Sequence, residues 1–203
     1  MRLFYSSTSP YVRKFMVLAH ETGLAGRIEL KPVSVSPVTR NPEVAAGNPL
    51  VKVPTLLLDD GTSLYDSPVI SEYLDTLHAG RPWFPVPGPA RWAALRRQAM
   101  ADGALDAAIL IRYELTLRPE DKRWPAWIDG QMVKIRQSLD ALEAEAATFG
   151  PDFTIGEIAV GCTLAYLDYR FGAEEWRKNR PALAAFDAAF AARPSMVATR
   201  PPA

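Results

Sequence analysis

The sequence predicts two halves of different class: an α/β half, followed by a half made of helices alone. Short strand-like segments alternate with helical ones as far as residue 78, and no strand-like segment follows residue 89. Residues 79–89 between them hold four prolines and two glycines, which exclude a helix or a central strand there. We therefore predict domains over residues 1–78 and 90–203, joined by a linker over residues 79–89.

The first half shows the pattern of a helix-covered α/β sheet. Residues 2–5 and 28–35 favour strands, and residues 10–23 between them favour a helix. An irregular segment with room for a short helix follows, and then the Asp-Gly pair inside residues 55–65 indicates a β-hairpin. Apolar residues at helical spacing over residues 69–77 predict an amphipathic helix. Strands and helices in this order are typical of an α/β layer architecture.

The second half predicts four helices: residues 90–117, residues 124–149, a helix that begins at Thr154, and residues 182–192, which Arg193-Pro194 ends. The third helix begins with a capping box, in which Thr154 is the cap and Glu157 bonds back to the Thr154 amide. Capping boxes mark helix starts, so this motif supports the prediction of a helix after Thr154.

The composition limits which partners are expected. Lys plus Arg and Asp plus Glu each number 23, and this zero net charge argues against nucleic acid or an anionic membrane as the main partner. No apolar run reaches the length of a membrane span, and the N-terminus lacks a signal-peptide pattern. A single cysteine, Cys162, fits a reducing cytoplasm, and we expect it to be a buried small hydrophobe. His20 and His78 form no ligand pattern, so we predict no metal site.

The first candidate motif is Ser9-Pro10 at the start of the first predicted helix. Serine is a favoured N-cap and proline is favoured at the first helical position. The Ser9 hydroxyl and the unbonded amides of that helix start would face one small volume, which favours an anion such as a thiolate. A helix cap without chemistry explains the same residues.

The second candidate motif is Asn48-Pro49-Leu50-Val51-Lys52-Val53-Pro54, which ends directly before the first strand of the hairpin. Proline suits the first position of a strand because it has no amide to donate. The Val53–Pro54 bond can be cis at such a place, which would turn the Val53 backbone outward to pair with an extended peptide. An ordinary strand start is the alternative.

The third candidate motif is Asp66-Ser67-Pro68, a second Ser-Pro helix opening. The backbone amides and the Ser67 hydroxyl could hold a carboxylate, and Asp66 could pair with an ammonium group. A carboxylate beside an ammonium is the head group of an α-amino acid. The alternative is a helix cap in which Asp66 interacts favourably with the helix dipole.

In their order and spacing, these motifs resemble those of the glutathione transferase superfamily over essentially the whole chain, and within it the small bacterial YibF-like members. The resemblance implies a thioredoxin-like N-terminal domain that holds glutathione, followed by an all-α domain. Ser9-Pro10-Tyr11 is similar to the segment that carries the catalytic Ser or Cys of the tau-like and omega-like classes. Lys52-Val53-Pro54 resembles the segment that binds the cysteinyl backbone of glutathione. Asp66-Ser67 resembles the pair that holds the γ-glutamyl group.

The resemblance implies a cytoplasmic, homodimeric detoxification enzyme that transfers the glutathione thiolate to a small hydrophobic electrophile. Glutathione would be the co-substrate, and no metal is implied. A glutathione-dependent peroxidase or reductase is one alternative, although an omega-like reductase would have Cys at position 9. A non-catalytic glutathione-binding module on the same fold is another. Tyr113, Tyr166 and Trp176 are candidates for the acceptor pocket, and core packing explains each equally well. The superfamily usually has Asp at the position of Glu157.

Overall fold

The computed structural model describes residues 1–202, and their contacts group the chain into two compact units. The first unit comprises Met1–Phe84 together with the C-terminal segment from Arg193, and the second comprises Pro85–Ala192. The sequence-based division differs at its end, because it places that C-terminal segment with the helices of residues 90–203.

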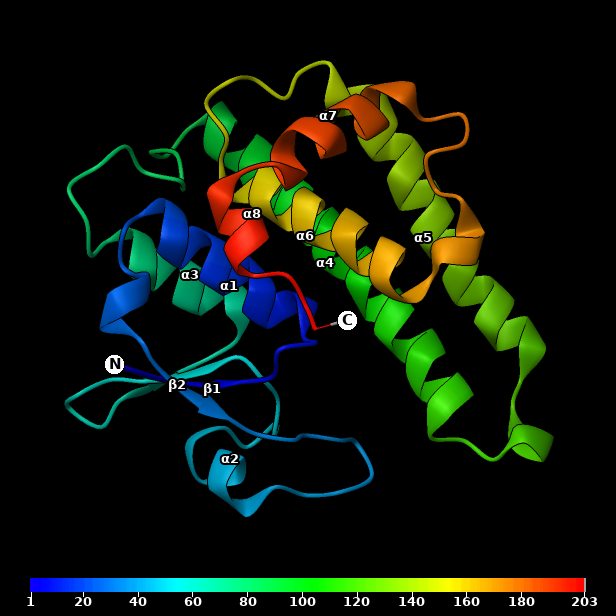
Figure 1. Ribbon diagram of the computed structural model, residues 1–203, viewed down its shortest axis with the longest axis horizontal. Helices are drawn as coiled ribbons and strands as arrows, with labels where there is room; N and C mark the ends of the chain where they lie inside the picture. The colour runs from blue at the N-terminus through cyan, green and yellow to red at the C-terminus, as the bar shows by residue number, and fades with distance from the viewer. Residues whose placement is uncertain (203) are drawn as a thin grey trace. The chain divides into compact units, whose positions relative to one another are not determined.

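The first unit contains a four-stranded sheet of the thioredoxin-like type (Figure 1). Its strands are β1 (Arg2–Tyr5), β2 (Glu29–Pro32), β3 (Thr55–Leu57) and β4 (Ser63–Leu64). They lie in the order β2-β1-β3-β4, with β2 parallel and β3 antiparallel to β1, and β4 antiparallel to β3. The predicted class of this half is confirmed, although β2 is shorter than the strand expected over residues 28–35.

Three helices cover the sheet on its two faces (Figure 1). α1 (Pro10–Glu21) and α3 (Ser67–Asp75) pack against each other on one face, and the short α2 (Pro42–Gly47) lies on the other. A short 3-10 turn, Ala25–Arg27, connects α1 to β2. The core side chains are fully buried and come from both sheet and helices: Leu3, Phe15, Leu18, Leu56, Ile70 and Leu74. The sheet therefore shares a well-buried core with the helical layer formed by α1 and α3.

The C-terminal segment joins the first unit through a partly buried ion pair that the sequence does not reveal. Arg193 donates from Nε and from one terminal nitrogen to the two carboxylate oxygens of Glu21, both at 2.7 Å. The Ser195 hydroxyl donates to the same carboxylate at 2.6 Å. A further short helix, α8 (Pro194–Ala198), follows, and Arg13 of α1 donates to the Met196 carbonyl oxygen at 3.0 Å. These contacts explain why the segment groups with α1.

Asp75 anchors the start of the predicted linker to α3. Its two carboxylate oxygens accept the amides of Trp83 and Phe84, each at 2.9 Å, and its Oδ1 lies 3.0 Å from His78 Nε2. Trp83 and Phe84 are themselves buried. The proline-rich stretch of residues 79–89 thus has an anchored first part, and the boundary between the compact units falls after Phe84.

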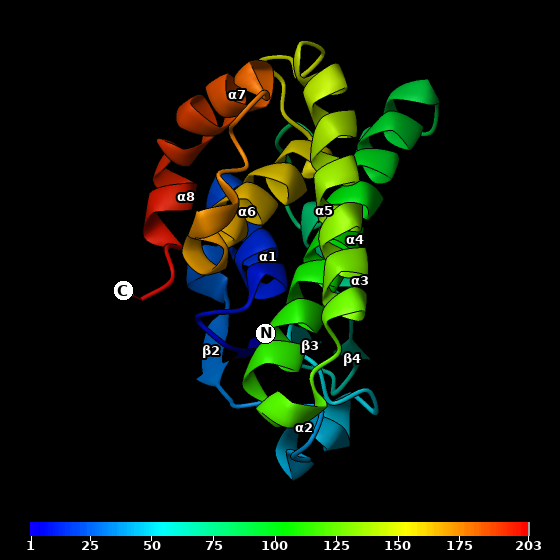
Figure 2. The ribbon, with the colours of Figure 1, turned by 90° about the vertical axis from the view of Figure 1, so that its right-hand side faces the viewer.

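The second unit consists of helices throughout its length, as the sequence predicts (Figure 2). Its long helices are α4 (Pro89–Thr116), α5 (Pro125–Ala146), α6 (Ile155–Arg170) and α7 (Pro181–Ala191), with 3-10 turns at Glu120–Lys122 and Gly172–Glu174. α6 is buried along most of its length and packs against both α4 and α7. Within residues 1–202, no helix is long and apolar enough to cross a membrane.

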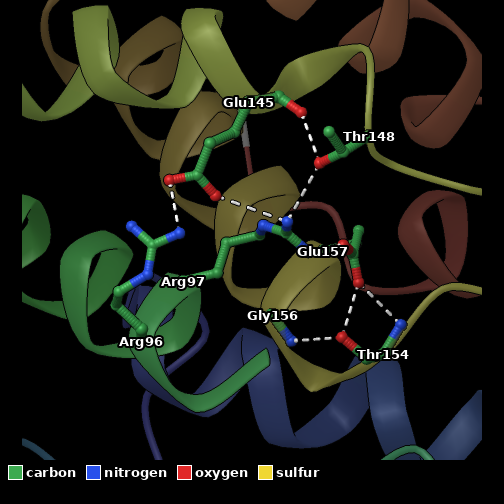
Figure 3. A network of polar contacts seen from close by, with 7 residues as sticks. All are labelled: Arg96, Arg97, Glu145, Thr148, Thr154, Gly156 and Glu157. Atoms are coloured by element: carbon green, nitrogen blue, oxygen red, sulfur yellow. Dashed lines mark hydrogen bonds and ion pairs between the residues drawn. The ribbon is translucent and has the colours of Figure 1, made fainter. Parts of the chain in front are cut away.

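The predicted capping box is present at the start of α6 and extends into a charged network (Figure 3). The Glu157 carboxylate accepts the Thr154 amide at 2.7 Å and the Thr154 hydroxyl at 2.6 Å, and the Thr154 oxygen accepts the Gly156 amide at 3.1 Å. Arg97 of α4 donates to the other Glu157 oxygen and also contacts Glu145 of α5 at 3.4 Å. The buried Glu157 carboxylate therefore connects α6 to α4, and Arg97 extends the network to Glu145 of α5.

We expect Glu21→Gln to lower the free energy of unfolding by about 1.5–3 kcal/mol at neutral pH, because hydrogen bonds to a charged group are lost. Burial alone would raise the pKa of Glu21, but hydrogen bonds from Arg193 and Ser195 outweigh it and hold the pKa below its ordinary value of 4.5. The carboxylate's contribution is therefore fully present above the unfolded pKa and is lost as the pH falls through the lowered, folded value. Denaturant titration of both proteins across acidic pH should show their stabilities converging.

Glu29→Gln is the matched control, since its carboxylate pairs with Arg2 at an exposed position. That substitution should change stability by less than about 1 kcal/mol. A difference between wild type and Glu21→Gln that stays constant into strong acid would contradict a role for the ionised Glu21.

Candidate active site

The strand register brings the three candidate motifs to one edge of the sheet. Phe4, near the end of β1, lies opposite Thr55, the first residue of β3. Leu64, the last residue of β4, lies opposite Leu56 of β3. The chain therefore leaves β1, enters β3 and leaves β4 at the same edge. The segments just outside these strand ends are Ser9, Lys52-Val53-Pro54 and Asp66-Ser67.

Ser9 is the N-cap of α1. Its backbone is extended, and its Oγ accepts a hydrogen bond from the Val12 amide at 3.3 Å. An accepting hydroxyl keeps its own hydrogen for a second partner. The Ser9 amide donates to the Ser6 carbonyl oxygen at 3.1 Å, which positions the cap at the end of the loop after β1. Ser9 can thus donate one hydrogen bond to an atom outside the helix.

Lys52-Val53-Pro54 leads into β3 with a cis Val53–Pro54 peptide bond. Pro54 is buried, Val53 is half-buried and Lys52 is exposed. Lys52 therefore offers a cation at the surface of this edge. Val53 lies just beyond the start of β3, before Pro54 and the first strand residue, Thr55. An extended peptide could pair with the Val53 backbone there.

A buried side chain that the sequence does not mark as functional, Asn48, positions this segment. Asn48 is 1% exposed, and its Nδ2 donates to the Lys52 carbonyl oxygen at 3.2 Å and to Thr55 Oγ1 at 2.9 Å. Its Oδ1 accepts the Leu50 amide at 2.9 Å, and Thr55 Oγ1 donates to the same Lys52 carbonyl oxygen at 2.8 Å. The Asn-Pro pair at 48–49 is a turn signal, but the side chain's partners emerge only in the folded chain.

Asp66 and Ser67 open α3, with Asp66 as the N-cap residue. The Asp66 side chain is exposed and caps no amide of the helix, so its carboxylate faces outward. Ser67 is 2% exposed and starts the helix, and the Ile70 amide donates to the Asp66 carbonyl oxygen at 3.1 Å. The peptide bond between Tyr65 and Asp66 is cis. The helix start and the adjacent carboxylate place an anion-binding and a cation-binding group side by side.

The edge as a whole suits an elongated, zwitterionic ligand. α1 and α3 both begin at this edge and pack together, so the positive ends of two helix dipoles lie there. The Val53 backbone can pair with a peptide between them, and Asp66 can accept an ammonium group. Within residues 1–202, no group of three His, Cys, Asp or Glu residues could hold a metal ion.

The other side chains singled out in the sequence lie in the second unit. Cys162 is fully buried in α6, as predicted for a small hydrophobe. Trp176 is buried as well, and its indole nitrogen donates to Asp168 at 2.8 Å. Tyr166 is 4% exposed and Tyr113 is half-buried.

Comparison with known families assigns both halves of the chain. Residues 8–77 match the family described as glutathione S-transferase, N-terminal domain. Residues 125–186 match the family described as glutathione S-transferase, C-terminal domain. The chain is also 32% identical over 205 residues to the uncharacterized GST-like protein YibF of Escherichia coli K12, and the match covers all of this chain and 99% of that protein.

Solved structures give the same assignment. A glutathione transferase family member from Pseudomonas fluorescens Pf-5 with bound glutathione is 50% identical, with a TM-score of 0.98 over 100% of this chain and 99% of that one. A second structure from that bacterium holds S-(propanoic acid)-glutathione and has a TM-score of 0.93 at 50% identity over the full length of both chains. A glutathione S-transferase from Methylobacillus flagellatus KT with glutathione bound is 39% identical, with a TM-score of 0.87 over 99% of each chain.

We expect Asn48→Ala to loosen the segment before β3, since it removes the acceptor of the Leu50 amide, one of the two donors to the Lys52 carbonyl oxygen and the buried bond to Thr55. The free energy of unfolding should fall by about 1–3 kcal/mol, the cost of leaving a buried polar group unpaired. Hydrogen exchange should accelerate at the amides of residues 50–55, as mass spectrometry of peptides can measure.

Asn41→Ala is the control, because it removes the same type of side chain from the N-cap of the neighbouring α2. It should accelerate exchange in α2 and leave residues 50–55 unchanged. Equal exchange in residues 50–55 of wild type and Asn48→Ala would show that Asn48 does not hold this segment.

Proposed function

Because the chain belongs to the glutathione S-transferase superfamily, we propose that it binds glutathione at this sheet edge and transfers the glutathione thiolate to a small electrophile. The observation that carries the proposal is the strand register, which gathers Ser9, Val53 and Asp66-Ser67 at one edge. The relatives with bound glutathione support the choice of ligand.

Each part of glutathione has a chemically suitable group at the edge. The Val53 backbone pairs with the cysteinyl residue of the tripeptide, in the manner of an added strand. The α3 start with Ser67 holds the γ-glutamyl carboxylate, and Asp66 accepts its ammonium group. Lys52 and Pro54 complete the segment that presents Val53, with Lys52 available to a carboxylate.

Ser9 stabilises the thiolate by donating the hydrogen that its capping bond leaves available. A cysteine thiol has a pKa near 8.5, and lowering it by about two units requires about 2.7 kcal/mol. A hydrogen bond to a charged group supplies about 1.5–3 kcal/mol. The start of α1 adds about 0.3–1 kcal/mol. One serine at one helix start is therefore sufficient, and no metal is needed.

In the reaction the thiolate sulfur supplies the electron pair of a new S–C bond. The electrophile either releases a leaving group with its bonding pair or, as an activated alkene, takes a proton at the neighbouring carbon. The S-(propanoic acid)-glutathione held by the Pseudomonas relative is a thioether, the class of product that either route gives, which supports conjugation.

A glutathione-dependent peroxidase remains a second candidate, because a stabilised thiolate also attacks peroxides. Serine at position 9 disfavours a reductase that works through its own mixed disulfide, since a hydroxyl cannot form one. A non-catalytic binding module is disfavoured by the hydrogen that Ser9 keeps available. Chromatography on immobilised glutathione and a conjugation assay separate the transferase from the binding module.

We also propose a cytoplasmic homodimer, with α3 of one subunit facing α4 of the other.

We expect Ser9→Ala to bind glutathione with nearly unchanged affinity, because Val53, Asp66 and Ser67 hold the peptide. The pKa of the bound thiol should rise by about one to two units, since about 1.4 kcal/mol corresponds to one unit. Conjugation at neutral pH should fall by about tenfold or more and partly recover at high pH. Thiolate absorbance of the complex against pH, with turnover in parallel, checks this.

Ser7→Ala removes an exposed hydroxyl from the same loop and should leave the titration and the rate unchanged. If Ser9→Ala also leaves both unchanged, Ser9 is only a helix cap. Ser9→Cys should gain reactivity toward disulfides, because a thiolate is itself a nucleophile.

We expect Asp66→Ala to weaken glutathione binding by about tenfold to a hundredfold, because the γ-glutamyl ammonium loses a charged partner. Stability should change little, since the Asp66 side chain is exposed and caps no amide. Calorimetric titration with glutathione measures the affinity. Asp59→Ala removes another exposed carboxylate of this unit and should bind as wild type does; unchanged affinity in folded Asp66→Ala would remove Asp66 from the site.

A further inference from the structure

Two arginines and three tyrosines gather where the C-terminal turns of α4 and α6 lie in the second unit. We call this group, made up of Arg112, Tyr113, Tyr166, Tyr169 and Arg170, the Arg112–Arg170 cluster. Tyr166 is buried, and the other four side chains are half-buried, so part of the group is open to solvent. Tyr113 and Tyr166 are also candidates for the acceptor pocket, so an inference about this cluster deepens the proposed function and rests on it. None of the five residues belongs to the proposed glutathione site.

The packing of α4 and α6 explains why residues so far apart in sequence meet. The Thr163 hydroxyl donates to the Ala101 carbonyl oxygen at 3.2 Å, and a Cβ on Gly156 would lie 2.9 Å from the Ala94 carbonyl oxygen. Both contacts have the same offset in residue number, so the two helices run in the same direction side by side. Continuing that direction brings the last turn of α6 beside the C-terminal part of α4.

The two arginines differ from other arginines of this unit in their partners. Arg97 pairs with Glu157 and Glu145, and Arg180 pairs with Asp140. Within residues 1–202, neither Arg112 nor Arg170 forms an ion pair with a carboxylate, and Arg170 Nε is a buried donor without a hydrogen-bond partner. A buried donor without an acceptor is costly, and an anionic ligand would supply the missing acceptor.

The aromatic rings give the cluster an apolar side. The Arg170 guanidinium lies over the Tyr169 ring, 3.8 Å from its centroid, and the Tyr166 and Phe171 rings lie 6.4 Å apart. Burial raises the pKa of the Tyr166 hydroxyl above its ordinary value, although Arg112 and Arg170 act on it in the opposite direction. The hydroxyl therefore stays protonated at neutral pH and can donate a hydrogen bond to an anion.

The helix dipole explains only part of this arrangement. Arg170 lies in the last turn of α6, where a cation is favoured. That preference gives Arg170 a reason for its charge but no acceptor for its buried Nε. It also does not account for Arg112, a second arginine on another helix, whose charge acts on the same tyrosine hydroxyl.

We propose that the Arg112–Arg170 cluster is a binding site for the carboxylate of an aromatic acid. The two guanidinium groups match a carboxylate, since each offers parallel N–H donors, and Tyr166 adds a hydroxyl donor. The tyrosine rings suit the flat apolar body of such an acid through offset or edge-to-face contacts. An inorganic anion would use the donors and leave the aromatic side of the cluster unmatched.

The experiment compares para-nitrobenzoate with para-nitrobenzamide, which have the same shape and differ in charge. Calorimetric titration of the full chain without glutathione keeps the result independent of the proposed transferase activity. Wild type should bind the benzoate at least about tenfold more tightly than the benzamide, because only the benzoate makes charged hydrogen bonds. Arg112→Gln and Arg170→Gln should each lose about tenfold or more for the benzoate and little for the benzamide.

Arg136→Gln is the matched control, because it removes the same charge from an arginine that pairs with Glu174 outside the cluster. It should leave the affinity for the benzoate within about twofold of wild type, as expected for an exposed pair. Equal affinity of wild type for the two compounds, no binding of either, or an equal loss in Arg136→Gln would overturn the proposal.

Salt dependence of the wild-type chain gives a readout that does not need the cluster variants to fold. Added sodium chloride should weaken binding of para-nitrobenzoate and leave binding of para-nitrobenzamide unchanged, since salt screens partly exposed charges. Affinity for the benzoate that does not respond to salt would count against the two arginines as its partners.

Discussion

The direction in which β3 runs against β1 is the constraint on which the candidate site depends. Because these strands are antiparallel, the start of β3 lies at the edge where β1 ends, and β4 ends there as well. Two helix starts and one strand start therefore lie together although they are far apart in the chain. A parallel β3 would place Val53 at the opposite edge from Ser9. The site follows from strand direction first and from side-chain identity second.

The second unit depends in a similar way on one buried carboxylate. Glu157 is 3% exposed, and its two oxygens accept bonds from the cap residue of α6 and from Arg97 of α4. Removing one partner would leave a buried charge uncompensated, which is much more costly than losing an exposed pair. Because α6 packs against both α4 and α7, the position of its first turn affects most of the unit. Glutamate in place of the aspartate usual in the superfamily fulfils the same capping role here.

The sequence predicted the features that depend on local chemistry. Periodicity and Ser-Pro or Asp-Gly signals located the strands and long helices, since each depends on neighbouring residues. It did not predict α8, because the five residues from Pro194 to Ala198 are too few for a periodic pattern. The contact between Arg193 and Glu21 joins residues 172 positions apart, and nothing local marks it. Asn48 stands in an Asn-Pro pair, which locally signals no more than a turn, and its bonds to Lys52 and Thr55 exist only once the loop has closed.

The two proposed binding sites differ in the same way, since one depends on short local motifs and the other on contacts between distant residues. The glutathione site relies on backbone groups and helix starts, which short motifs such as Ser9-Pro10 and Val53-Pro54 specify. These motifs therefore carry a family resemblance that can be seen in the sequence. The Arg112–Arg170 cluster relies on side chains from two helices, and in sequence each arginine is only one more charged residue on a helix. Ligand specificity in the second unit thus has to be inferred from packing, because it arises where α4 and α6 run side by side.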